Sequence, residues 1–207
     1  MTAPRSPAAN RAPCARCARS LGRSCCEVRE GEHLATLTRA DVERIQSATR
    51  LPRSAFVEEE VLDEAEARAY ERRRPAWRGY FRTGAVRLTL ARSAGACVFL
   101  DRTAGCTLAP DRRPTACRLY PFEPSAGDGW TLGVEREGSV ARARASGEAR
   151  CLGVEEAGGR RALLSAFGAT DASLRALAAR LRAEVHAHAG GDGSRPNGPS
   201  RRRTRLR

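Results

Sequence analysis

Eight cysteines constrain this 207-residue chain more than any other feature of its sequence. They cluster near the start of the chain and around its middle, at Cys14, Cys17, Cys25, Cys26, Cys97, Cys106, Cys117 and Cys151. The first 13 residues hold no apolar stretch typical of a secretory signal, so we expect the protein to stay in the cytoplasm. Thiols in that reducing compartment are free unless they are catalytic or bind metal. The cysteines therefore indicate a thiol-based site.

The first two cysteines form a C-x2-C pair, Cys14-Ala15-Arg16-Cys17. A tight turn with this spacing aims two thiolates at one metal ion, and the same spacing also occurs in dithiol redox motifs. The redox motif usually opens a helix after a strand, whereas this pair follows a proline-rich start. Metal binding is the favoured interpretation.

The next two cysteines, Cys25 and Cys26, are adjacent. Adjacent side chains point to opposite faces of a strand, or about 100° apart on a helix, and seldom converge on one small tetrahedral ion. Three interpretations follow: two metal centres that share this segment, one polynuclear cluster with ligands from several directions, or a buried thiol at one of the two positions.

The formal net charge of +13 is concentrated at the two ends of the chain. Residues 1–24 contain five arginines and no acidic residue, and residues 189–207 contain six arginines and one aspartate, which leaves residues 25–188 with only +3. Weak nucleic-acid binding through the arginine-rich ends is the most that this distribution favours. No apolar run approaches the roughly 18 to 20 residues of a membrane span, so we expect no membrane association.

Helices are expected on both sides of the central cysteines. Thr38 and Asp41 have the spacing of a capping box, which predicts a helix that ends before Leu51. The glutamate-rich segment 54–74 suits either a second, exposed helix or a partly irregular segment, and residues 160–167 and 172–188 are predicted to form two more helices. His186 and His188 fall in the last turn and are interpreted as surface residues that interact with the helix dipole, rather than as ligands.

Between these helices the pattern predicts short strands and loops. Residues 86–90 alternate apolar and polar side chains, and 97–100 and 131–134 are short apolar runs. Residues 113–119 suit one helical turn. We therefore expect an α+β fold, a small irregular single domain of short strands and loops around a cysteine-ligated metal centre, flanked by helices.

Several motifs together resemble the CxxCxxCC cysteine-cluster family, also called the YkgJ-type zinc- or iron-chelating domain. The resemblance rests on the first four cysteines, on Cys97-Val98-Phe99-Leu100-Asp101, on Gly105-Cys106-Thr107-Leu108, on Cys151-Leu152-Gly153, and above all on Arg113-Pro114-Thr115-Ala116-Cys117-Arg118-Leu119-Tyr120-Pro121-Phe122. Seven residues separate Cys17 from Cys25, where the family has two. A longer loop can still close on one site, because closure entropy grows slowly with length.

The resemblance implies a zinc or iron centre, with a 4Fe-4S cluster as one form, and it leaves the metal undetermined. All eight cysteines are candidate ligands, and we expect Arg113, Arg118 and Tyr120 to surround them, since arginine N–H groups can hydrogen-bond thiolates. Two alternatives stay open: an iron-sulfur or zinc enzyme related to the lysine N-methylases that act on flagellin, and a zinc-dependent nucleic-acid-binding module. No catalytic residue is predicted.

The domain organisation follows from composition. We expect a disordered segment over residues 1–12, the cysteine-cluster metal-binding domain over 13–188 and a disordered arginine-rich tail over 189–207. The Gly-, Pro-, Ser- and Arg-rich tail holds too little apolar surface to offset its ordering entropy.

Overall fold

The computed structural model describes residues 16, 17, 20, 24–27, 34–125, 129–132 and 151–190, without the side chains of residues 155 and 190. Its elements over residues 34–190 are α2 (Arg39–Thr49), η2 (Arg53–Ala55), β1 (Val57–Val61), α3 (Glu64–Arg73), η3 (Pro75–Trp77), β2 (Val86–Leu90), β3 (Arg92–Ser93), β4 (Ala96–Cys97), β5 (Leu100–Asp101), β6 (Gly105–Cys106), α4 (Thr115–Leu119), β7 (Phe122–Pro124), β8 (Trp130–Leu132), α7 (Leu152–Glu156), α8 (Arg160–Ala166) and α9 (Asp171–Gly190). The α+β class is confirmed. Residues 1–12, Cys14 and the tail beyond residue 190 lie outside the described residues, so the predictions made for them are not addressed.

The strands form four separate antiparallel pairs: β1–β2, β3–β4, β5–β6 and β7–β8. The longest pair, β1–β2, runs in register from Val57 opposite Leu90 to Val61 opposite Val86. The pairs β3–β4 and β5–β6 have two residues in each strand. Isolated two-stranded pairs are marginal in water, so the segments that carry Cys97 and Cys106 depend on packing from elsewhere.

The helix predicted over residues 54–74 is wrong in its first half. Residues 57–61 form a strand, because the chain pairs with β2 along its whole length, with Leu88 and Leu90 buried. The helix α3 begins only after Asp63, which closes a capping box with Glu66. Non-local pairing has overridden the local preference of a glutamate-rich segment.

Helix α2 confirms the predicted capping box. The Thr38 hydroxyl accepts the backbone N–H of Asp41, and the Asp41 carboxylate accepts that of Thr38. The helix ends at Thr49, before Leu51 as predicted, and its C-cap residue Arg50 has a left-handed backbone at φ 59°. Val42 and Ile45 are buried on the inner face of the helix, and Asp41 in its first turn is buried as well. The predicted strand at 86–90 and the predicted helical turn at 113–119 are also confirmed, as β2 and α4.

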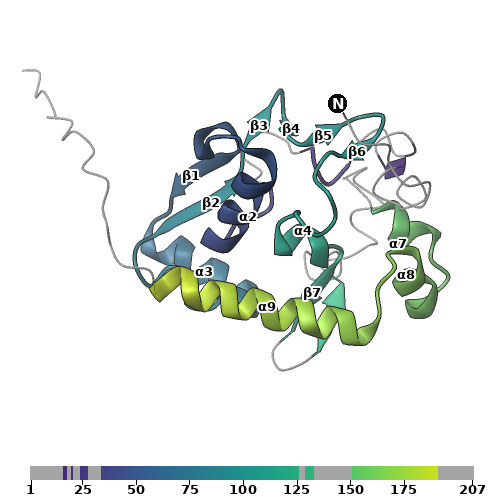
Figure 1. The fold of residues 1–207 in the computed structure, drawn as a ribbon. Coiled ribbons are helices and arrows are strands. Elements are labelled where there is room, and N and C mark those ends of the chain that lie inside the picture. Colours follow the sequence, from purple (N-terminus) through teal and green to yellow (C-terminus); the bar gives the residue numbers. More distant parts are fainter. Residues whose placement is uncertain are drawn as a thin grey trace, which may run out of the picture.

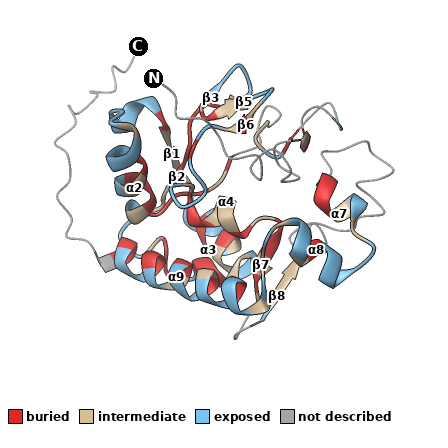
Figure 2. Ribbon diagram, turned by 45° about the vertical axis from the view of Figure 1, so that its right-hand side comes forward, coloured by how far each residue is buried: buried red, intermediate tan, exposed pale blue. Residues whose placement is uncertain are grey.

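Two apolar clusters make up the core of the described residues. The first joins α2, β2 and the short strands through Leu34, Leu37, Val42, Ile45, Phe56, Leu88, Leu90, Cys97, Phe99 and Leu108. The second packs η3, α4, β7 and α8 on α9 through Tyr70, Ala76, Trp77, Tyr80, Leu119, Phe122, Leu163, Leu174, Leu181 and Val185. Helix α9 runs along the bottom of Figure 1, with buried residues on the face towards the domain in Figure 2. No helix in the described part is long and apolar enough to cross a membrane.

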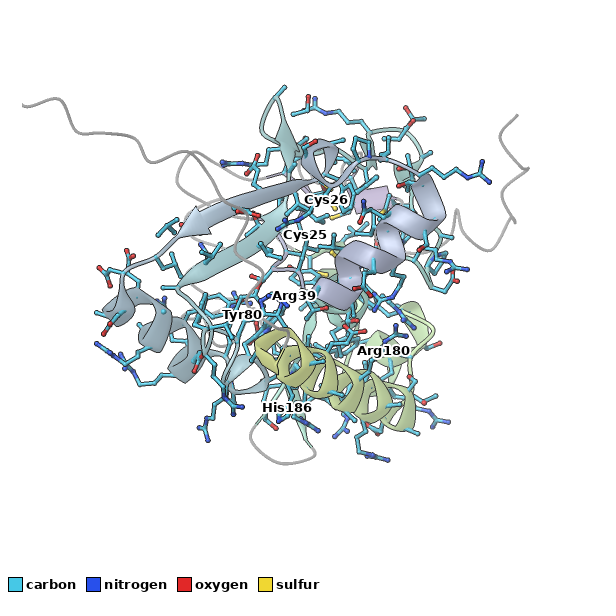
Figure 3. The ribbon with its side chains drawn as sticks, turned by 60° about the vertical axis from the view of Figure 1, so that its left-hand side comes forward. Cys25, Cys26, Arg39, Tyr80, Arg180 and His186 are labelled. Atoms are coloured by element: carbon cyan, nitrogen blue, oxygen red, sulfur yellow. The ribbon has the colours of Figure 1, made fainter. Side chains whose placement is uncertain are left out.

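The interpretation of His188 as a surface residue is wrong. Its side chain is buried and its ring stacks on Tyr80 at a centroid distance of 4.1 Å, while Nδ1 accepts the backbone N–H of Arg39 at 3.2 Å. Burial lowers the pKa of His188 to about 4. His186, two residues earlier on α9, is exposed as expected (Figure 3).

Candidate metal centre

One cavity of about 290 Å³ is lined by every described cysteine. They come from well-separated parts of the described chain: Cys17, Cys25, Cys26, Cys97, Cys106, Cys117 and Cys151. Cys17, Cys97 and Cys151 are buried, and Cys25 is exposed. Residues that the sequence spreads over more than a hundred positions therefore meet around one space.

Backbone pairing places Cys26 beside Cys97. The carbonyl oxygen of Cys26 accepts the backbone N–H of Cys97 at 2.7 Å, and Glu27 forms an antiparallel bridge with Ala96. A turn holds this short segment, since the Glu27 carboxylate accepts the backbone N–H of Ser24 at 2.9 Å. Residues 24–27 thus lie beside β4, and Figure 3 shows Cys25 and Cys26 close together.

Cys106 lies opposite Leu100 in the β5–β6 pair. The connecting turn is closed by Asp101, whose carboxylate accepts the backbone N–H groups of Thr103 and Ala104 at 2.8 and 2.7 Å. Gly105 follows with φ +77°, a conformation that strongly favours glycine. This tight turn returns the chain directly to the cavity.

Cys117 is carried by α4, a helix of only five residues. So short a helix is not stable alone, and other elements hold its start. The Asp41 carboxylate accepts the backbone N–H of Thr115 at 2.9 Å, and the Thr115 hydroxyl donates to Glu184 at 3.0 Å. Arg44 forms buried ion pairs with both carboxylates. Helices α2 and α9 therefore jointly fix the position of Cys117.

A bidentate ion pair joins the segment of Cys17 to that of Cys151. The Arg16 guanidinium contacts the two oxygens of Glu156 at 3.0 and 2.7 Å. Arg16 precedes Cys17, and Glu156 ends α7, whose N-cap is Cys151. Both cysteines are buried, whereas the side chains of the ion pair are exposed.

Three of the thiols have pKa values that are shifted by burial and by neighbouring groups. Burial raises the pKa of Cys97 to about 12, and the nearby Cys26 and Cys106 add to the rise. Burial also raises the pKa of Cys117 well above its usual value, with further contributions from Cys26, Cys97 and Cys106. A hydrogen bond from Cys25 and the charge of Arg113 lower the pKa of Cys26. These four thiols therefore share one electrostatic environment.

The three residues expected around the cysteines have different positions. Arg113 and Tyr120 line the cavity, and Nε of Arg113 donates to the Leu108 carbonyl at 3.1 Å. Arg118 is not among the described residues that line the cavity. Burial lowers its pKa, and its charged neighbours are Arg180, Arg44, Asp111 and Glu184. Arg118 therefore lies near the ion pair between Arg44 of α2 and Glu184 of α9.

The donor set fits a thiophilic metal in its chemistry. Among the described residues that line the cavity, the cysteines are joined by one carboxylate, Glu123, which pairs with Arg74 at 3.3 Å, and by no histidine. Thiolate ligands select zinc or iron-sulfur centres over magnesium or calcium. Within the described ranges, no group of three or more His, Cys, Asp or Glu side chains is arranged to hold a metal ion as it stands. Coordination would require the sulfurs to move closer together.

The sequence analysis did not identify one wall of the cavity. It also did not identify the polar contacts of Asp41, Thr115 and Glu184 that hold the start of α4. The wall contains Tyr70, whose hydroxyl hydrogen-bonds to Thr36 at 2.7 Å, with the guanidinium groups of Arg74 and Arg87 over its ring at 5.4 and 5.3 Å. The aromatic and arginine residues of the segment 70–87 were visible, but they have no characteristic spacing. Only the fold shows that they face the cysteines.

An α+β fold with thiols gathered around one cavity is the arrangement expected of a cysteine-rich metal-chelating domain. A comparison with protein families gives the same result: a family model described as "Putative zinc- or iron-chelating domain" matches residues 13–142. The chain belongs to this family, CxxCxxCC, as its motifs indicated. The comparisons with curated proteins and with solved structures each gave no match.

Proposed function

We propose that this protein binds zinc or iron through the cysteines that line its cavity, and that the metal serves as a structural or stored centre. The observation that carries the proposal is the convergence of Cys17, Cys25, Cys26, Cys97, Cys106, Cys117 and Cys151 on one space. The family description, which names zinc and iron chelation, supports it. The lining contains seven sulfur donors and one carboxylate already paired with arginine, so thiolate coordination is the favoured chemistry.

The size of the cavity is compatible with either metal form. At about 290 Å³ it exceeds the roughly 150 Å³ that accommodates a benzene molecule in an engineered protein cavity. A four-thiolate zinc ion and a 4Fe-4S cluster are both held by four cysteines. When bound, the metal would supply cross-links between chain segments, and an iron-sulfur cluster would add electron transfer.

A structural role is favoured by the segments that carry the ligands. The strands β4 and β6 contain two residues each, and α4 contains five. Ligation from these segments would add binding free energy directly to the free energy of folding. The thiols of Cys97 and Cys117, with raised pKa values, would each release a proton to solvent as the sulfur binds metal.

Metal analysis of the protein purified without air tests the proposal. The protein is expected to contain zinc, or to be brown with broad visible absorption if it contains an iron-sulfur cluster. The double variant Cys97→Ser/Cys117→Ser should lose metal, whereas Thr103→Ser, in the exposed β5–β6 turn, should retain it. Equal metal content in the two variants would contradict the proposal.

A further inference from the structure

The net positive charge of residues 25–188 comes from one short stretch. Residues 72–82 contain no acidic residue and five arginines, which are Arg72, Arg73, Arg74, Arg78 and Arg82. Because these five contribute +5 to a total of +3, the other residues between 25 and 188 carry a net charge of −2. The high arginine content of the whole chain therefore does not account for this local excess of positive charge.

The fold brings the two ends of this stretch together. It begins in the last turn of α3, passes through η3 and ends in the turn before β2. The backbone N–H of Phe81 donates to the Glu71 carboxylate at 3.1 Å, and the rings of Phe81 and Tyr70 meet edge to face at a centroid distance of 5.7 Å. The turn that carries Arg82 is therefore held beside the end of α3 that carries Arg72.

Three arginines of the stretch are available to a partner. Arg72, Arg78 and Arg82 are exposed, and within the described part of the chain they form no ion pair or side-chain hydrogen bond. Arg74, by contrast, pairs with Glu123 at 3.3 Å. The three exposed arginines do not line the cysteine cavity either. We call Arg72, Arg78 and Arg82 the arginine surface.

The arginine surface lies at the C-terminal end of α9. Tyr80, in the middle of the stretch, stacks on His188 at 4.1 Å, and the backbone N–H of the exposed Arg39 donates to the same histidine at 3.2 Å. Figure 3 shows Arg39 and Tyr80 at the end of α9 that carries His186. In the sequence, this end leads into residues 191–207, which contain six arginines and one aspartate. Two arginine-rich parts of the chain thus begin at one place in the fold.

The chemistry of the surface favours a phosphate backbone as its partner. Arginine N–H groups bind phosphate oxygens in pairs, and duplex DNA presents one negative charge per about 1.7 Å of its axis. A lipid bilayer fits less well, because the large apolar side chains exposed among the described residues are Leu51 and Val61, both outside the stretch. A single strand also fits less well, because Trp77 and Tyr80 are buried and cannot stack on its bases.

We infer that the arginine surface binds the backbone of duplex DNA without reading its sequence. This function goes beyond metal binding and does not depend on it, because the surface and the cysteine cavity share no residue. Each arginine that contacts a phosphate releases a condensed counterion, so the affinity falls steeply as the salt concentration rises. The arginines of residues 191–207 are attached at the same end of α9 and add to the attraction.

Fluorescence anisotropy with the full-length protein and a labelled DNA duplex of about 20 base pairs tests the inference. Arg72→Gln/Arg78→Gln/Arg82→Gln should weaken binding at least about tenfold at about 0.1 M salt, and should reduce the slope of log affinity against log salt by about two to three. The matched control is Arg50→Gln/Arg161→Gln/Arg175→Gln, which removes three other exposed arginines. It should change the affinity less than about threefold and leave the slope unchanged.

Both triple variants should keep the wild-type metal content, because none of the six arginines lines the cavity. If the first triple variant fails to fold, Arg72→Gln and Arg78→Gln alone should each lower the slope by about one. Equal losses of affinity in the two triple variants would overturn the inference, as would an absence of DNA binding by the wild-type protein. Tighter binding to phosphatidylserine vesicles or to single-stranded DNA than to the duplex, lost in the first variant, would also overturn it.

Discussion

The carboxylate of Asp41 accepts the backbone N–H of Thr115 at 2.9 Å, two residues before Cys117 in the chain. The same carboxylate completes the capping box of α2 and pairs with Arg44, and it is fully buried. One side chain thus starts α2, neutralises a buried arginine and fixes α4. The geometry of the candidate metal centre is therefore tied to the polar core of the domain.

Replacing Asp41 with alanine should reduce the free energy of unfolding by about 3 kcal/mol, because Arg44 would be left in the interior with one carboxylate fewer. Urea unfolding followed by circular dichroism measures the change. Asp63→Ala is the matched control, since Asp63 caps α3 in an exposed capping box and its loss should cost about 1 kcal/mol. If both variants lost the same free energy of unfolding, the contacts that Asp41 makes outside α2 would contribute nothing to stability.

Arg113 and Arg118 should differ in their effect on metal affinity. Arg113 lines the cavity and its charge lowers the pKa of Cys26, whereas Arg118 has its charged neighbours in the α2–α9 network. Arg113→Ala should therefore weaken zinc binding by about tenfold, and Arg118→Ala should leave it unchanged. Competition with a chromophoric zinc chelator measures both affinities. A larger loss of zinc affinity in Arg118→Ala than in Arg113→Ala would contradict this, because it would mean that Arg118 stabilises the thiolates.

His188 should make the protein less stable as the pH falls. Burial, first, and the charges of Arg39 and Arg53 lower its pKa to about 4, below the ordinary value near 6.5. Between these two pH values the unfolded chain takes up a proton that the folded protein does not. The free energy of unfolding should therefore decrease from pH 6.5 towards pH 4, by up to about 3 kcal/mol from this group.

The variant His188→Phe, which retains a ring to stack on Tyr80, isolates this contribution. At neutral pH it should cost about 1 kcal/mol through the lost acceptor for the Arg39 N–H, and the difference from wild type should shrink or reverse by pH 5. His186→Phe, on the exposed side of α9, is the control and should follow the wild-type pH profile. Parallel profiles for His188→Phe and wild type would show that His188 titrates normally in the folded protein.

The Arg16–Glu156 ion pair should control the access of reagents to Cys17 and Cys151 and should contribute little to global stability. Both side chains are substantially exposed, so Arg16→Ala should barely change the urea midpoint. Its expected effect is faster alkylation of Cys17 and Cys151. The charge reversal Arg16→Glu/Glu156→Arg should restore slow alkylation, whereas Arg16→Glu alone should not. Identical alkylation rates in all these variants would mean that the pair does not hold the two segments together.

The elements predicted correctly are those specified by neighbouring residues. Thr38 and Asp41 are three positions apart, and the alternation at 86–90 is contained in the strand itself. The segment 57–61 was assigned wrongly because its partner strand lies almost thirty residues further along the chain. The prediction that His188 lies on the surface was wrong for a similar reason, because its contacts with Tyr80 and Arg39 form only when α9 packs on the rest of the domain.

For the site, the chemistry was predictable and the arrangement was not. The number and spacing of the cysteines indicated thiol ligands, because a C-x2-C pair and clustered cysteines are typical of metal sites. Nothing local in the sequence indicates that residues 24–27 pair with β4, or that Asp41 holds the start of α4. The different positions of Arg113 and Arg118 likewise depend on which side of α4 meets α9.

X-ray absorption at the edge of the bound metal tests the central claim most directly, because it reports the atoms that coordinate the ion in the intact protein. The account predicts a shell of sulfur atoms only, at about 2.3 Å for zinc, and a loss of that shell in Cys97→Ser/Cys117→Ser. A first shell made mainly of nitrogen or oxygen at about 2.0 to 2.1 Å would contradict it, because such a metal would be held by residues other than the cysteines that line the cavity.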